Sequence, residues 1–306
     1  MPDLYVCGAS AINYYSKCGI CVTTDLLSFS NTAVPDLPYT HMLGAARSPD
    51  STCLITTNSG GVIRTSDFVS YVCYDMNFKQ SQMNQIIHNN QFIAAGYDRN
   101  HLNQEQAQLW ISGNGFDQYS WQARYAVFDT YSAFTNLCTT AGSNVVAVGY
   151  ADNLRTSLLV MGTALGTWQR VNLPSQLQGG LWSVASDGVR VWVGGQGWVA
   201  TALLSNLNSW TKTDLGVSQT VRSLVTVNNQ VVAVAGDQIF YSDNLFDYQH
   251  TQVPGHTLTQ CVVFGDKVII GSHSLLTQSD LFVWDPTLKS LQNKSCGVQA
   301  YAFMIV

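Results

Sequence analysis

The strongest constraint on this chain is one two-strand pattern that recurs seven times along its 306 residues. Each copy has an apolar strand, a small polar turn, an aromatic or apolar residue and a second strand, which is typical of a β-hairpin. The copies cover residues 20–29, 62–71, 109–119, 158–168, 199–210, 239–248 and 281–291. Their starts lie about 40 to 49 residues apart. A regular period of roughly 40–50 residues indicates a ring or array of similar β-units.

Two further strands precede each hairpin. One is apolar and usually ends in Gly, as in residues 92–97 and 145–150. The other is short and rich in small residues, as in residues 42–46 and 222–225. Four strands per unit and seven units predict an all-β, seven-bladed β-propeller of four-stranded blades, with residues 1–306 as a single domain.

The two ends of the chain complete one another. The first unit lacks its short strand, and residues 299–306 supply one that nothing follows. A ring that stayed open would expose sheet edges, so we expect the C-terminal strand to join the N-terminal strands in one blade, beside residues 4–8. The predicted blades span approximately 40–78, 81–125, 131–173, 179–215, 219–254, 257–293, and 297–306 together with 3–36.

Composition limits the partners. Charged residues make up 11% of the chain against roughly 25% in typical domains, and the formal net charge is -5. No Lys/Arg cluster is present, so we expect no nucleic-acid partner. No apolar run approaches the roughly 18 residues of a membrane span, and the first residues lack a basic leader, so neither membrane insertion nor a signal peptide is expected. A surface of Ser, Thr, Asn and Gln is typical of sugar-binding proteins or components of larger assemblies.

The hairpin turns resemble a degenerate Asp-box, the turn of bacterial-neuraminidase-type repeats, Ser-x-Asp-x-Gly-x-x-Trp. Similar pairs are Thr24-Asp25 with Phe29, Ser66-Asp67 with Tyr71, Ser205-Asn206 with Trp210, and Ser242-Asp243 with Tyr248. The central Gly is mostly missing. The resemblance covers nearly the whole chain and implies a propeller fold far more than a function.

Sialidases share that repeat, and their chemistry requires three Arg, a Tyr nucleophile with a Glu partner, and an Asp. Only Arg47 and Arg222 fall near inner strands, and the sole Glu, Glu105, falls in a polar loop over 103–106. We therefore predict no catalytic residues and no enzyme activity, with a divergent glycosidase as an alternative.

Eight scattered Cys favour buried free thiols. A disulfide or a metal site at the blade that closes the ring stays an alternative. It would be formed by Cys18 and Cys21 with Cys7 or Cys296, although a structural zinc requires four ligands. No cofactor or metal is predicted.

A binding site is expected on the face formed by loops that enter the inner strands and by loops between second and third strands. Two of the latter are expected to be long, over 10–17 and 97–108. Tyr beside Asp and Arg suits the recognition of sugars or proteins. The candidate residues are Tyr14, Tyr15, Tyr97, Asp98, Arg99, His101, Tyr125, Asp129, Tyr131, Tyr150, Asp152 and Arg155.

These features together favour a non-enzymatic binding propeller, a virus or phage spike, tail or attachment component that recognises a host glycan or protein. The chain is then expected in a virion or in the cytoplasm. An intracellular scaffold or assembly factor that grips a protein partner is the alternative, beside the divergent sialidase-like glycosidase.

Overall fold

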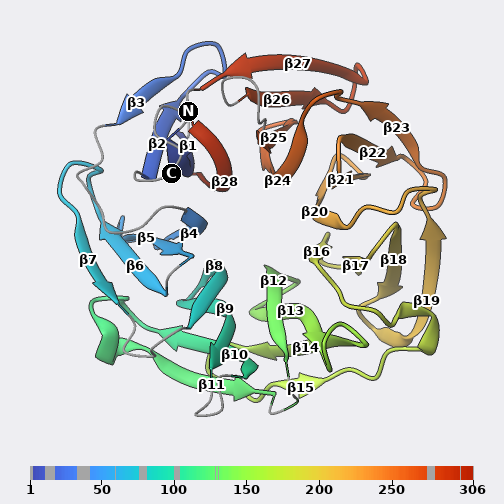
Figure 1. Ribbon diagram of the computed structural model, residues 1–306, viewed down its shortest axis with the longest axis horizontal. Helices are drawn as coiled ribbons and strands as arrows, with labels where there is room; N and C mark the ends of the chain where they lie inside the picture. Colours follow the sequence, from blue (N-terminus) through green and yellow to red (C-terminus); the bar gives the residue numbers. More distant parts are fainter. Residues whose placement is uncertain are drawn as a thin grey trace.

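The computed structural model describes residues 3–10, 18–32, 42–58, 60–75, 81–99, 104–127, 129, 131–273, 280–296 and 298–305. They form seven four-stranded antiparallel sheets, set as blades around one axis (Figure 1). The predicted seven-bladed, all-β propeller is therefore confirmed. The helical segments in these residues are two single turns, η1 (Gln118–Ser120) and η2 (Ser175–Leu177). Neither is long or apolar enough to cross a membrane.

Six blades run in chain order from the axis outward. Their strands are β4 (Met42–Arg47), β5 (Cys53–Thr57), β6 (Gly61–Thr65) and β7 (Val72–Asp75); β8 (Gln82–Asn89), β9 (Gln91–Arg99), β10 (Glu105–Ser112) and β11 (Gln122–Ala126); β12 (Ala133–Thr139), β13 (Asn144–Ala151), β14 (Thr156–Thr163) and β15 (Gln169–Arg170); β16 (Ser183–Ser186), β17 (Arg190–Gly194), β18 (Trp198–Leu203) and β19 (Asn206–Asp214); β20 (Val221–Val227), β21 (Gln230–Ala235), β22 (Gln238–Ser242) and β23 (Gln249–Gln252); β24 (Thr257–Phe264), β25 (Lys267–His273), β26 (Asp280–Asp285) and β27 (Ser290–Ser295).

The seventh blade joins both ends of the chain. Its order from the axis is β28 (Val298–Ile305), β1 (Leu4–Ser10), β2 (Cys18–Thr23) and β3 (Ser30–Thr32). β28 runs antiparallel to β1, with Leu4 opposite Ile305. Leu4, Val6 and Ala302 are fully buried at this seam. The predicted closure by the C-terminal strand is confirmed, and it gives β1 a partner on both sides.

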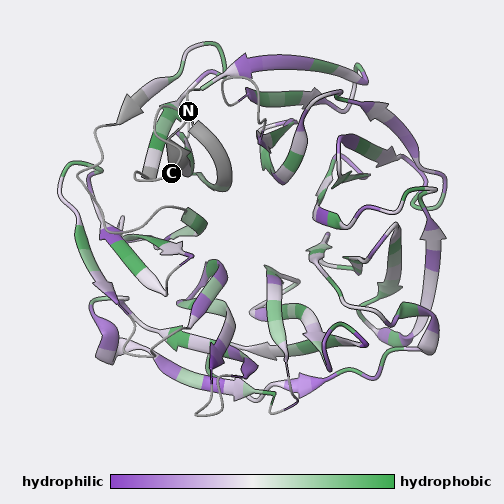
Figure 2. Ribbon diagram, in the orientation of Figure 1, coloured by the Kyte–Doolittle hydropathy of each residue, from purple (hydrophilic) through white to green (hydrophobic). Residues whose placement is uncertain are grey.

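The core lies between successive blades. The middle strands are apolar on both faces, because each blade packs against two neighbours; Val145, Val146, Ala147 and Val148 of β13 are all fully buried. The outermost strands face solvent on one side, and β19, β23 and β27 carry long hydrophilic stretches (Figure 2). This alternation explains how a chain with so few charges presents a polar rim.

Side-chain oxygens cap the turns between third and fourth strands. Asp67 accepts hydrogen bonds from the backbone N–H groups of Val69 and Ser70, at 2.9 and 2.8 Å. Phe68, between them, has a φ of 56°, a conformation that costs an L-residue energy and is held by these bonds. Asp25 forms the same pattern. The relation of these turns to neuraminidase-type repeats stays a prediction.

One predicted turn residue needs correction. In the turn after β22, Asn244 rather than Asp243 accepts from the backbone, at the N–H groups of Phe246 and Asp247. Asp243 instead accepts from Gln230 and forms an ion pair with Lys289. The capping position lies one residue later than the sequence pattern indicates.

Candidate functional site

A β-bulge recurs near the start of six inner strands in the described part of the chain. At each bulge the strand register skips one residue or a pair. The skipped residues are Leu43, Asn84, Thr135, Arg222, Thr259 with Gln260, and Tyr301. A bulge bends its strand and redirects a side chain. Because the bulges fall at a similar place in these six blades, they lie together at one end of the axis.

A cavity of about 390 Å³ lies at that end. Skipped residues from five inner strands line it, beside residues at the ends of second strands. The described residues of the lining are Leu43, Gln82, Asn84, Tyr97, Thr135, Asn136, Tyr150, Trp182, Thr220, Arg222, Thr259 and Gln260. It contains three aromatic rings, four amides, three threonines and one charge. We call this space the axial cavity.

The aromatic residues come from neighbouring blades. The rings of Tyr150 and Trp182 lie 5.5 Å apart, tilted by 40°. The Tyr97 hydroxyl donates to Gln82 Oε1 at 3.3 Å. Burial raises the pKa of Tyr150 to about 12, with smaller effects from Glu105 and Tyr97, and burial also raises the pKa of Tyr97. Both phenols are therefore neutral hydrogen-bonding groups at physiological pH.

Amide and hydroxyl contacts fix the polar side of the cavity. Gln82 Nε2 donates to Asn84 Oδ1 at 2.7 Å, and Asn84 Nδ2 donates to the carbonyl oxygen of Phe134 in the next blade, also at 2.7 Å. Thr135 Oγ1 donates to the carbonyl oxygen of Leu181, one blade further on, at 2.8 Å. These bonds, two of which join neighbouring blades, hold the side chains in place before any ligand arrives.

One buried acceptor remains available. Gln260 Oε1 is buried and accepts no hydrogen bond from a described residue. Gln260 and Asn136 line both the axial cavity and a second cavity of about 310 Å³ further along the axis. A buried acceptor is costly unless a donor pairs with it, so this oxygen favours a ligand that brings an O–H or N–H group.

The structure brings two of the predicted residues into the cavity, Tyr97 and Tyr150. Asp98 and Arg99 lie beside it on β9 with partners of their own. Asp98 accepts from Ser81 at 3.2 Å, and Arg99 pairs with Glu105 at 3.1 Å. Tyr14, Tyr15 and His101 are not among the residues that the structure describes.

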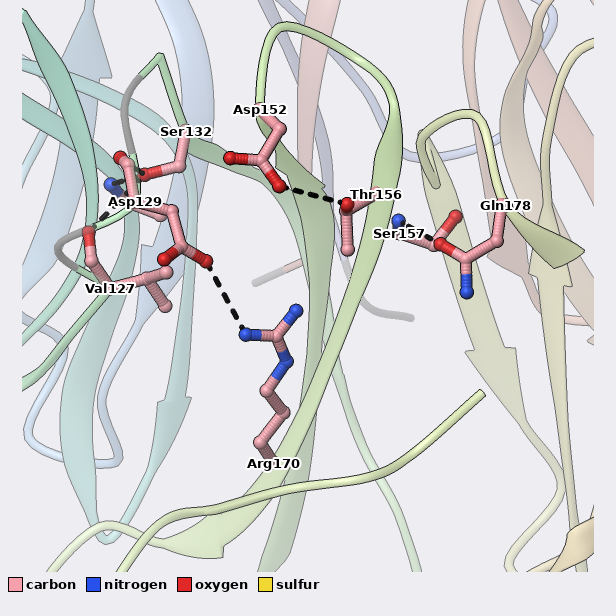
Figure 3. Close-up of polar contacts among 9 residues, drawn as sticks. Val127, Asp129, Ser132, Asp152, Thr156, Ser157, Arg170 and Gln178 are labelled. Carbon is pink, nitrogen blue, oxygen red and sulfur yellow. Dashed lines mark hydrogen bonds and ion pairs between the residues drawn. The ribbon is translucent and has the colours of Figure 1, made fainter. Parts of the chain in front are cut away.

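The remaining predicted residues stand away from the cavity lining. Asp129 forms an ion pair with Arg170 at 3.4 Å, and Asp152 accepts from Thr156 at 3.0 Å (Figure 3). Arg155 is exposed in the turn after Asp152. Tyr131 is 49% exposed with a φ of 51°. Tyr125 was expected on the binding face formed by loops, but it lies on the outermost strand β11, where its ring packs 6.3 Å from that of Phe134.

Two further expectations were wrong for one reason. Glu105 begins strand β10 rather than lying in a loop, and the long loop expected over 97–108 shortens because β9 extends to Arg99. Arg99 and Glu105 are directly opposite in the ladder. An opposite-charge pair across two strands stabilises the pairing that sequence propensity alone did not indicate.

The bulged residues were missed, although a signal was present. Gly96 and Gly149 lie near the ends of second strands, and each pairs with the residue that precedes a skipped one. A Cβ on Gly96 would lie 1.8 Å from the carbonyl oxygen of Gln82. A recurrent Gly at this point, twice followed by Tyr, marks where the bulged backbone comes close.

The closing blade contains buried thiols. Cys7, Cys21 and Cys296 are buried, and a hydrogen bond with Cys296, together with burial, raises the pKa of Cys21. No group of three or more His, Cys, Asp or Glu among the described residues is placed to hold a metal. The side chain of Cys18 lies outside those residues, so its part in a disulfide or metal site stays open.

Comparisons with known proteins establish the fold alone. No family model matches the chain, and no curated protein matches its sequence. Among solved structures, it is similar to the periplasmic gluconolactonase PpgL of Pseudomonas aeruginosa, with a TM-score of 0.71, 10% identity and coverage of 100% of this chain and 99% of that one. A protein of Lactobacillus plantarum gives a TM-score of 0.70, 9% identity and full coverage of both chains. The WD40 propeller domain of Doa1 gives 0.62, 11% identity, and coverage of 88% and 86%.

Proposed function

We propose that this chain is a non-catalytic binding propeller that recognises a carbohydrate in the axial cavity. The observation that carries the proposal is the lining itself. Tyr97, Tyr150 and Trp182 face amides and hydroxyls across a space of about 390 Å³, which falls within the usual range of roughly 300–1,000 Å³ for small-molecule sites.

Sugars present both kinds of surface that this lining matches. The C–H face of a sugar ring packs on an aromatic side chain, while its hydroxyls donate to and accept from amides. Gln260 Oε1 supplies a buried acceptor for one such hydroxyl. Gln82 is bonded to Asn84, and further bonds link Asn84 and Thr135 to neighbouring blades; this network reduces the entropy lost when a ligand binds.

The part of the lining that the structure describes contains no carboxylate, which supports binding over hydrolysis. Glycoside hydrolysis requires, in most enzymes, two Asp or Glu residues beside the scissile bond. None of the described residues that line the axial cavity is acidic, and the nearby Glu105 is paired with Arg99. For the biological setting we propose attachment of a virus or phage to a host glycan, which the low-charge, amide-rich composition supports; virion structural genes beside this one would be the expected gene neighbours.

A glycan array followed by calorimetry tests the proposal. We expect the purified protein to bind a defined subset of glycans, and Trp182→Ala and Tyr150→Ala to weaken that binding roughly 10- to 100-fold. Tyr119→Ala is the matched control, because Tyr119 is 80% exposed and absent from the lining. Melting curves establish that each variant folds. Binding to no glycan at high protein concentration, or equal losses in all three variants, would overturn the proposal.

A further inference from the structure

We infer that the sugar recognised in the axial cavity carries an oxyanion, a carboxylate or a sulfate group, and that Arg222 binds it. This inference rests on the proposed function and adds the charge class of the ligand.

Arg222 owes its position to the bulge in β20. The register passes from Val221 to Ser223, and both of these neighbours are buried, while Arg222 is exposed. The skipped residue therefore leaves the packed interface and reaches the open end of the axis. Its side chain lines the axial cavity and also an adjoining cavity of about 520 Å³. Arg222 thus stands where the two spaces meet, within reach of a ligand in either.

Among the described residues that line the axial cavity, Arg222 is the only charged one. No ion pair or hydrogen bond joins its side chain to another described residue, whereas Arg99 and Arg170 are paired with Glu105 and Asp129. A guanidinium has five N–H donors in a planar fork that matches the two oxygens of a carboxylate or sulfate. These donors are available to a ligand.

The other charged groups near Arg222 have partners. Asp237, which lines the adjoining cavity, accepts from Gln252 Nε2 at 2.8 Å. His256, also in that lining, lies 3.3 Å from Ser272 Oγ and 3.6 Å from Asp280 Oδ2. The histidine is therefore held toward Asp280, and Arg222 is left as the cation that faces the ligand.

The net charge of the chain strengthens the argument. At -5, the molecule as a whole repels anions, so binding of an acidic sugar depends on a local positive group in a partly enclosed site. An anionic ligand group that meets a guanidinium there forms charge-assisted hydrogen bonds, which are about twice as strong as neutral ones.

Calorimetry with matched sugars tests the inference. The probes are a uronic-acid disaccharide, its carboxyl-reduced neutral form and a sulfated neutral disaccharide. We expect the wild-type protein to bind at least one acidic probe roughly 10-fold or more tighter than the neutral form, and the carboxylate and sulfate arms show which oxyanion is preferred. In Arg222→Gln the ratio of acidic to neutral affinity should fall to about one. Arg222→Lys should retain part of it, because the charge remains but the fork is lost.

Arg124→Gln is the control, because Arg124 lies exposed on the outermost strand β11 and should leave the ratio as in the wild type. A preference for acidic sugars that persists in Arg222→Gln, or wild-type binding of neutral sugars with no acidic preference, overturns this inference alone. The absence of binding to any probe and to the glycan array overturns the proposed function with it.

Discussion

The carbonyl oxygen of Ala133 lies where a side chain on Gly149 would begin, since a Cβ built on Gly149 would stand 2.0 Å from that oxygen. Gly149 of β13 pairs with Phe134, the residue before the skipped Thr135. The bulge that turns Thr135 into the axial cavity therefore requires a residue without a side chain on the strand beside it. The glycine of the second strand is therefore needed for the backbone conformation that places Thr135 in the lining of the cavity.

Gly149→Ala tests this coupling. The added methyl must displace the Ala133 backbone, so we expect a loss of roughly 1–3 kcal/mol in the free energy of unfolding, together with weaker ligand binding. Chemical denaturation measures the first effect and calorimetry the second. Gly113→Ala is the control, because nothing lies within 4 Å of a Cβ there, and its change should stay within about 0.5 kcal/mol. Equal stability of the two variants would refute the coupling.

The fold could be predicted from the sequence because each blade repeats local signals. Apolar strands and capped turns at a fixed period are readable from neighbouring residues, and even the closure followed from a missing strand at one end and a spare strand at the other. Tyr97 and Tyr150 were found because they follow glycines near the ends of second strands.

The rest of the site depends on strand register, which is not local. Whether Asn84, Thr135 or Arg222 is paired or skipped is decided by the neighbouring strand, so periodicity along one strand cannot show it. The position of Tyr125 was predicted wrongly for a related reason. Its strand β11 is the outermost of its blade, and no single-strand pattern reports distance from the axis.

Deletion of residues 298–306 should open the ring. It removes β28 with the buried residues Ala302, Phe303 and Met304, and it leaves Leu4 and Val6 of β1 without their inner partner. Because the lost core contacts contribute several kcal/mol to the free energy of unfolding, we expect the melting temperature to fall by more than about 10 °C. Ile305→Ser, at a position 39% exposed, is the control and should change it by only a few degrees. A truncated protein that melts like the full chain would mean that β28 does not close the ring.

The capped turn at Asp67 makes a prediction in acid. Backbone hydrogen bonds from Ser70 and Val69 hold the pKa of Asp67 below its ordinary value of 3.8. Because the folded pKa is lowered, the stabilisation is present above pH 3.8 and is lost as the pH falls through the folded pKa. Asp67→Ala should lower the denaturation midpoint at neutral pH, whereas Asp67→Asn should largely keep it, since Asn244 caps the equivalent turn. The Asn variant should also lose less stability than the wild type in acid. Equal midpoints for the Ala variant and the wild type at neutral pH would exclude the cap as a stabilising contact.

Tyr150 makes the opposite prediction in alkali. Burial raises its pKa to about 12, so the folded protein favours the neutral phenol more strongly than the unfolded chain does. The contribution to stability is complete below the ordinary pKa of 10 and is lost as the pH rises toward 12. Over that window, urea midpoints of the wild type should fall more steeply than those of Tyr150→Phe, which has no proton to lose. Below pH 10 the two slopes should coincide. Parallel loss of stability in both proteins above pH 10 would mean that other buried phenols, such as Tyr71 and Tyr74, whose pKa values burial also raises to about 12, account for the whole effect.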